Sequence, residues 1–104
     1  MTRIEWLTHE HFAPLVGQDM AVDAGARGTV TMRLVEATVG TQPGGPGPEG
    51  QQRLQFSLVL LGPGGQVLPQ GTYAVTHEAV GEQHLFLVPL GRDDAGVRYE
   101  AAFA

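Results

Sequence analysis

Hydrophobic and polar positions alternate along most of the chain, and this alternation predicts strands. Four stretches carry an apolar side chain at every second residue: Met20 and Val22; Val30, Met32 and Leu34; Leu54, Phe56, Leu58 and Leu60; Val97, Tyr99, Ala101 and Phe103. A period of two places such residues on one face of a strand. Glycine-containing turns separate the stretches. The pattern predicts an all-β, mainly antiparallel fold of about six strands in meander order, forming a small barrel or a two-sheet sandwich.

The N-terminal segment has a different period and predicts one short helix, over residues 8–16. A threonine, a favoured N-cap residue, stands at its start. Phe12, Leu15 and Val16 are spaced i, i+3, i+4, which places them on one apolar face. Pro14 removes one helical hydrogen bond, so we expect a kink or two separate turns.

Two irregularities interrupt the strand pattern. After Leu34 the apolar phase shifts to Val35, Ala37 and Val39, which indicates a bulge or a bend that changes the sheet face. Residues 41–51 are rich in proline and glycine, which remove donors and raise the entropic cost of ordering. We therefore expect a flexible surface loop at 41–51.

The two C-terminal turns suggest a register for the last three strands. A turn centred between Val80 and Gly81 sets His77 opposite His84, and one centred between Asp93 and Asp94 pairs the last two strands. Both turns then place the same set of side chains on one buried face: Tyr73, Val75, Phe86, Val88, Leu90, Val97, Tyr99 and Ala101.

A different loop at the first turn is the alternative. A three-residue loop with Gly81 in a left-handed conformation shifts the pairing and puts Phe86 out of phase with Val75, so we disfavour it. In the favoured register, with His77 opposite His84, Leu85 and Leu87 lie on the opposite face of their strand. We expect that strand to be covered on both sides, with the N-terminal helix as the second cover.

Composition bounds the kind of protein. The chain has 104 residues, of which 42% are hydrophobic and 16% are charged. This size and composition predict a single globular domain over residues 1–104. There is no cysteine and no lysine, which excludes a thiol nucleophile, a cysteine-ligated zinc site and a P-loop. The net charge of −5 without a basic run argues against nucleic acid and anionic membranes as partners. We find no secretory signal and no membrane-length apolar run, so we expect a cytoplasmic location.

Histidines are the first candidates for chemistry. In the register above His77 and His84 are opposite each other, with Glu78 and Glu82 close by, and a cross-strand histidine pair with a carboxylate could bind zinc. Spacing fixes no third ligand, so two polar residues near the mouth of a hairpin are the favoured interpretation. We expect no metal and no cofactor.

Other polar side chains fit structural roles. Asp93 and Asp94 lie in a glycine-bounded turn, where aspartate is favoured because it bonds its own backbone. Ser57 lies within a strand and lacks the glycines of a nucleophile elbow. We therefore assign no catalytic residue and expect no enzyme.

Four residues are candidates for contact with a protein partner: Trp6, Arg98, Glu100 and Phe103. Trp6 either clamps the helix to the sheet or contributes to a partner surface. The strand that ends at Phe103 either closes a barrel against an earlier strand or is an open edge guarded only by Arg98 and Glu100. An open edge could pair with another chain, so a protein partner or self-association is expected.

Three blocks of sequence carry a resemblance. They are Glu10-His11-Phe12-Ala13-Pro14-Leu15-Val16-Gly17; Leu68-Pro69-Gln70-Gly71-Thr72-Tyr73; and Leu85-Phe86-Leu87-Val88-Pro89-Leu90-Gly91 with Tyr99-Glu100-Ala101-Ala102-Phe103. In this order they resemble an uncharacterised family of small bacterial domains of unknown function, found near phage-tail-collar or tail-fibre-like proteins. The resemblance covers essentially the whole chain and implies no activity and no catalytic residues.

The leading hypothesis is a non-enzymatic protein-interaction or structural, assembly-accessory domain, linked to a phage-tail-like fibre or surface assembly. One alternative is a small-molecule-binding β-barrel with Tyr73 and Tyr99 lining the interior. A second alternative is a metal site with hydrolytic activity at His77 and His84.

Overall fold

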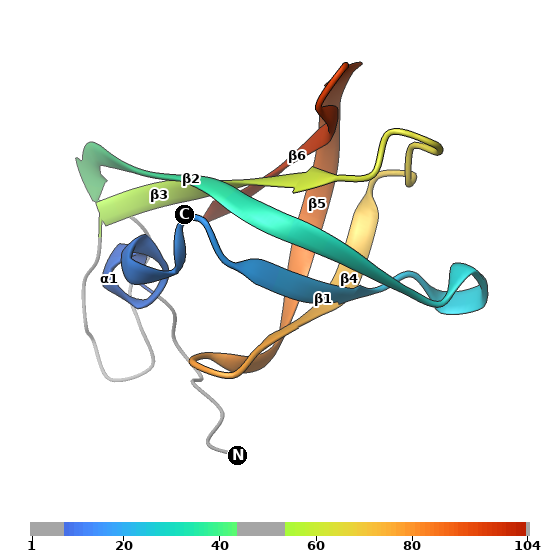
Figure 1. The fold of residues 1–104 in the computed structure, drawn as a ribbon. Coiled ribbons are helices and arrows are strands. Elements are labelled where there is room, and N and C mark those ends of the chain that lie inside the picture. The colour runs from blue at the N-terminus through green and yellow to red at the C-terminus, as the bar shows by residue number, and fades with distance from the viewer. Residues whose placement is uncertain (1–7, 44–53, 104) are drawn as a thin grey trace.

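The computed structural model describes residues 8–43 and 54–103, which form one closed six-stranded barrel and one short helical segment (Figure 1). The elements are α1 His9–Phe12, the 3-10 turn Ala13–Leu15, β1 Asp19–Asp23, the 3-10 turn Gly25–Arg27, β2 Thr29–Pro43, β3 Leu54–Gly62, β4 Gly71–His77, β5 Gly81–Asp93 and β6 Gly96–Phe103.

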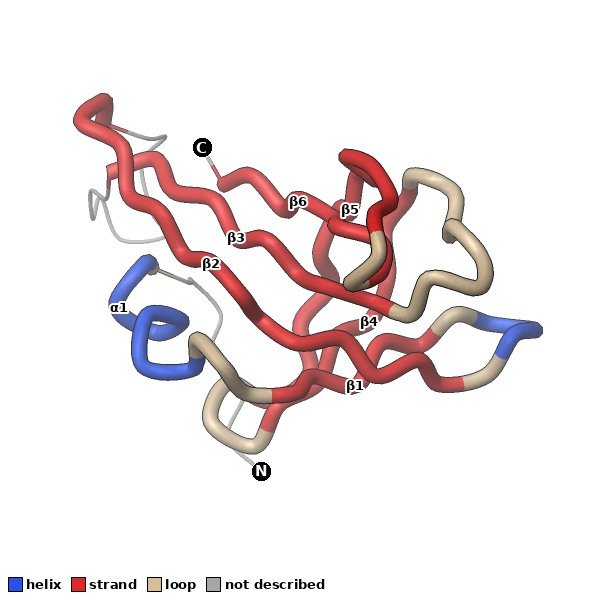
Figure 2. Tube along the Cα trace, turned by 45° about the horizontal axis from the view of Figure 1, so that its top comes forward, coloured by secondary structure: helices blue, strands red, loops and turns tan. Residues whose placement is uncertain are grey.

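The strand order around the barrel is β1-β2-β3-β6-β5-β4, and every pair is antiparallel. The predicted six antiparallel strands, the barrel and the helix are confirmed. The predicted meander holds within β1–β3 and within β4–β6 but not between them. The chain crosses from β3 to β4, so β3 lies beside β6 in a Greek-key arrangement (Figure 2).

The barrel interior is filled by side chains from all six strands and from the helical segment. The buried hydrophobic residues are Phe12, Leu15, Met20, Val22, Met32, Leu34, Phe56, Leu58, Leu60, Leu68, Val75, Val80, Leu85, Leu87, Val97, Tyr99 and Ala101. Burial of each large aliphatic or aromatic side chain contributes about 1.5–3 kcal/mol before conformational entropy is subtracted. The alternation in the sequence therefore marks the inner face of β1, β2, β3 and β6 correctly except at Leu54, which is 47% exposed.

The helical segment divides at Pro14, as predicted, because α1 ends at Phe12 and a 3-10 turn follows. The ring of Phe12 lies 6.1 Å from that of Phe56 and 6.0 Å from that of Phe103, and it is buried. The segment packs against β2 and β3 (Figure 1). The predicted apolar face is wrong at Val16, which is 44% exposed.

The hairpin of β4 and β5 has a different register from the predicted one. His77 is opposite Gly81, and Gly81 has φ +71°. The turn between them has three residues, and its Val80 is buried in the core, with its N–H donated to the His77 carbonyl. Burial of Val80 explains why the chain adopts the loop that the sequence pattern disfavours.

This register turns β5 over, because an odd shift exchanges the two faces of a strand. Leu85 and Leu87 point into the core, and Phe86 is 49% exposed. The helical segment covers β2 and β3 instead of β5, so the predicted second cover of β5 is wrong.

Three register shifts interrupt the strand pairing. In β2 one lies between Leu34 and Glu36, which confirms the predicted irregularity after Leu34, and another lies between Val39 and Pro43. In β5 the register shifts between Pro89 and Gly91, so Leu90 is an extra residue. The sequence pattern places Leu90 in the core opposite Val97, but it is 55% exposed.

Strand β6 is paired on both sides, with β3 and with β5. Of the two alternatives for the last strand, closure of the barrel is the one that the structure shows. The exposed-edge interpretation is wrong at Arg98 and Glu100, because these residues are paired with both β3 and β5, whereas Ala101–Phe103 are paired with β3.

The connection from β3 to β4 is held by two tyrosines. The Leu68 N–H donates to the Tyr99 hydroxyl at 2.9 Å in the core, and the Tyr73 hydroxyl donates to the Pro69 carbonyl at an exposed site. These bonds fasten the segment that crosses the end of the barrel between β3 and β4.

We predict that Tyr99→Phe lowers the free energy of unfolding by about 1–3 kcal/mol, because it leaves the buried Leu68 N–H without its acceptor. The matched control is Tyr73→Phe, which removes an exposed bond and is expected to change stability by less than about 0.5 kcal/mol. Urea unfolding of both variants measures the difference. Equal losses would contradict the assignment.

We predict that Gly96→Ala destabilises the fold by roughly 2–4 kcal/mol. Gly96 has φ +137°, and an added Cβ would lie 2.1 Å from the Gly62 carbonyl oxygen. The control is Gly65→Ala, where a Cβ meets nothing within 4 Å. Thermal unfolding followed by circular dichroism compares the two, and a Gly96→Ala variant as stable as Gly65→Ala would refute the close approach.

Candidate functional site

The outer sides of four neighbouring strands, β2, β3, β6 and β5, form the candidate site, which we call the four-strand face. Strand alternation turns one set of their side chains out of the barrel. The cross-strand pairs arrange these side chains in rows that run across the strands. One of these rows carries positive charge, and a neighbouring row carries negative charge.

The first of these is the basic row. Arg33 is opposite Leu61, and Leu61 is opposite Arg98. The bulge places Leu90 next to Arg98, and both line one shallow hollow. The row therefore reads arginine, leucine, arginine, leucine across the four strands.

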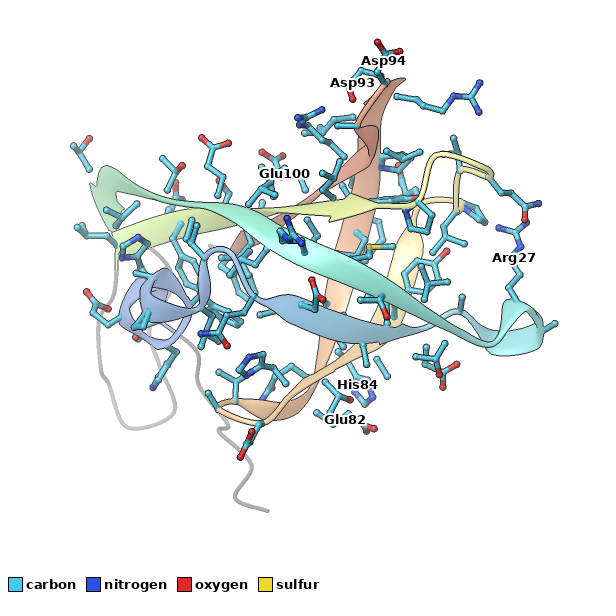
Figure 3. All side chains as sticks on the ribbon, viewed as in Figure 1. Arg27, Glu82, His84, Asp93, Asp94 and Glu100 are labelled. Atoms are coloured by element: carbon cyan, nitrogen blue, oxygen red, sulfur yellow. The ribbon has the colours of Figure 1, made fainter. Side chains whose placement is uncertain are left out.

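The second is the acidic row. Glu36 is opposite Val59, Val59 is opposite Glu100, and Glu100 is opposite Val88. Figure 3 shows Glu100 on the outer side of the barrel, away from α1. Charged and aliphatic side chains alternate here in the same columns as in the basic row.

A third row of small and polar side chains lies beside the acidic row. Thr38, Ser57 and Ala102 pair across β2, β3 and β6 and line an open hollow of about 320 Å³, together with Gln55 and Glu100. The small side chains make this part of the face lower than the rows of longer residues.

The turn between β5 and β6 bounds the face. One carboxylate oxygen of Asp93 accepts the Ala95 N–H at 2.9 Å, and the other is paired with Arg98. The Ala95 bond, and then Arg98, hold the pKa of the Asp93 carboxyl below its ordinary value of 3.8. Asp93 thus has a structural role at the tip of the hairpin, where Asp94 also lies (Figure 3).

The histidines are not brought together as a pair. His84 is opposite Ala74, and its Nε2 lies 3.7 Å from a Glu82 carboxylate oxygen. The Nε2 of His77 lies 2.8 Å from the Gln18 side-chain oxygen, and its Nδ1 accepts the Ala79 N–H. The predicted His77–His84 pairing is wrong, and no group of three metal-ligating side chains occurs in residues 8–43 and 54–103.

The four interaction candidates separate in the structure. Arg98 and Glu100 lie in the middle of the four-strand face. Phe103 is half-buried on the inner side, where its ring stacks on Phe56 at 4.3 Å between centroids. Trp6 lies outside the described residues.

The sequence does not reveal six of the eight residues in the two charged rows. It places Val88 and Leu90 in the core and does not single out Arg33, Glu36, Val59 and Leu61. The missed signal is the extra residue at Leu90, which has no clear mark in a strand of mixed apolar residues.

Comparison with known proteins gives one result. The model of a family described as "Domain of unknown function (DUF6916)" matches residues 7–103. No curated protein and no solved structure matches the chain. Within the described residues, no helix is long and apolar enough to cross a membrane.

We predict that Arg98→Gln raises the pKa of Asp93 but leaves it below 3.8, because the larger cause, the Ala95 N–H bond, remains. Since the folded-state pKa is lowered, the carboxylate favours the folded state above the ordinary pKa. That contribution is lost as the pH falls through the lowered value. NMR titration of the side-chain carboxyl carbon measures both proteins. An unchanged pKa in the variant would contradict the role of Arg98.

Proposed function

The chain belongs to the DUF6916 family, and from that premise we propose that it is a non-enzymatic protein-interaction domain that docks protein chains through the four-strand face. A structural or assembly-accessory role in a phage-tail-like fibre is the concrete form of this proposal. It is supported by the resemblance to bacterial domains found near tail-fibre-like proteins. A cytoplasmic location is part of the same proposal.

The observation that carries the proposal is the composition of the four-strand face. Leu90 is 55% exposed, and Val59, Leu61 and Val88 are half-buried beside it, so aliphatic surface reaches the solvent between charged side chains. Protein interfaces combine an apolar centre with polar groups that fix orientation. Of the strands below, β3 and β6 are paired on both sides at Val59, Leu61, Arg98 and Glu100, which gives the middle of the face a rigid support.

Three of the histidines make contacts within the domain. The Nδ1 of His11 accepts the Thr8 N–H at 2.9 Å, and the Nε2 of His9 lies 3.1 Å from the Ala37 carbonyl oxygen. His77 contacts Gln18 and Ala79. These contacts assign structural roles to His9, His11 and His77.

We predict that Leu90→Asp weakens association at least about tenfold, because it puts a charge into the apolar part of the face. The control is Val67→Asp, a comparably exposed valine (42%) in the connection from β3 to β4. Size-exclusion chromatography with light scattering measures the mass of the chain alone and when mixed with a tail-fibre-like protein.

Association that Val67→Asp leaves intact and Leu90→Asp removes is the expected result. A chain that stays at 11.0 kDa alone and ignores that protein would overturn the proposed function. Equal effects of the two substitutions would show that a different surface is used.

A further inference from the structure

We infer that the four-strand face is self-complementary, and we propose that it binds a second copy of this chain, with each β6 antiparallel to the β6 of the other copy. This inference rests on the proposed function, because it names one partner for the same face. It comes from the order of the residues in the two charged rows.

Each of the four strands contributes one residue to each row. The columns, basic row first, are Arg33 and Glu36 in β2, Leu61 and Val59 in β3, Arg98 and Glu100 in β6, and Leu90 and Val88 in β5. Columns lie about 4.8 Å apart, and residues two apart along a strand are about 6.6–6.8 Å apart. The rows are thus one strand period apart, and each charged column has one residue of each sign.

A two-fold axis that runs across the strands, midway between the rows, exchanges the rows and keeps the columns. In a symmetric dimer of this kind, residue i meets residue j and residue j meets residue i. Arg98 then faces Glu100 of the second copy, and Arg33 faces its Glu36. In the aliphatic columns Leu90 faces Val88 of the second copy. All four columns are complementary at once.

The other two-fold arrangement fails on charge. An axis parallel to β6 keeps each row over the same row of the second copy, so that Arg98 faces an arginine-bearing row and Glu100 faces an acidic one. Like charges held together at an interface cost free energy. The charge pattern therefore selects the antiparallel arrangement of the two β6 strands.

The charged groups of the face are available for this contact. Glu100 has no ion pair among the residues that the structure describes. Arg98 is paired with Asp93 and Arg33 with Asp19, but these side chains are 41–61% exposed. Exposed pairs of this kind contribute little, about 0–1 kcal/mol, so exchange for a partner across the interface is easily accommodated.

The size of the four-strand face sets the expected affinity of the self-association. Four strands and two or three rows span about 15–20 Å in each direction. The outer surface of a barrel is also convex, so the total buried area stays below about 1,200 Å², a range typical of weak, transient association. We expect a dimer that dissociates on dilution.

We predict that R98E and E100R each prevent self-association, and that an equimolar mixture of the two variants associates again. R98E makes the β6 column wholly acidic and E100R makes it wholly basic, so each repels itself and attracts the other. Sedimentation velocity over a concentration series measures the weight-average mass, which rises above 11.0 kDa for the unchanged chain and for the mixture only.

Matched controls are charge reversals away from the face. Arg27 lies at the tip of the β1–β2 hairpin and Glu82 on a different side of the barrel from Glu100 (Figure 3). R27E and E82R should each leave self-association unchanged. Circular dichroism checks the fold of every variant. If R98E does not fold, R33E and E36R in the β2 column carry the same prediction.

Two results would overturn the inference: an unchanged chain that stays at 11.0 kDa at every concentration, or a mixture of folded variants that stays monomeric. If the chain alone is monomeric but binds the tail-fibre-like protein in a way that Leu90→Asp disrupts, only the self-association falls. If it binds neither, the proposed function falls with it.

Discussion

The pairing of β3 with β6 is the contact on which the rest of the structure depends. It joins two runs of three strands that are otherwise linked only by β1–β4, and the two junctions together close the barrel. Closure requires the chain to cross from β3 to β4, and the hydroxyls of Tyr99 and Tyr73 hold that crossing. Residues Val97–Glu100 of β6 are paired with β3 along one edge and with β5 along the other, so a partner cannot add a strand there and contacts outward-facing side chains instead.

The four-strand face is a product of the same pairing and of two bulges. If Val35 were a regular strand residue instead of a bulge, alternation would turn Glu36 inward with Leu34, opposite Leu58 in the core. The bulge returns Glu36 to the outer side, beside Val59. The bulge at Leu90 likewise adds a second residue opposite Arg98, which puts an exposed leucine next to the arginine. The alternating rows therefore depend on local departures from regular strand geometry.

The sequence predicts those parts of the fold that depend on local pattern. Alternation marks the inner faces of β1, β2, β3 and β6 with the exception of Leu54, Pro14 divides the helical segment, and the phase shift after Leu34 marks a bulge. The register of β4 and β5 was missed because it depends on burial of Val80, a tertiary contact that no spacing reveals. The crossover from β3 to β4 was missed because two hairpin runs can be joined in several orders. Both are non-local choices.

In the candidate site, too, the sequence predicts what depends on local pattern and misses what depends on non-local pairing. Arg98 and Glu100 were selected as guards of an open edge. The edge is closed, but both side chains still face outward, because alternation alone decides that. Phe103 follows the opposite parity and stacks on Phe56 inside. Leu90 and Val88 needed the register and the bulge. A single strand thus shows which residues share a face, whereas the charged rows exist only across β2, β3, β6 and β5, where pairing sets arginine and glutamate in adjacent rows. The capacity to recognise a partner is consequently a property of the sheet, and it depends on the barrel being closed in this strand order.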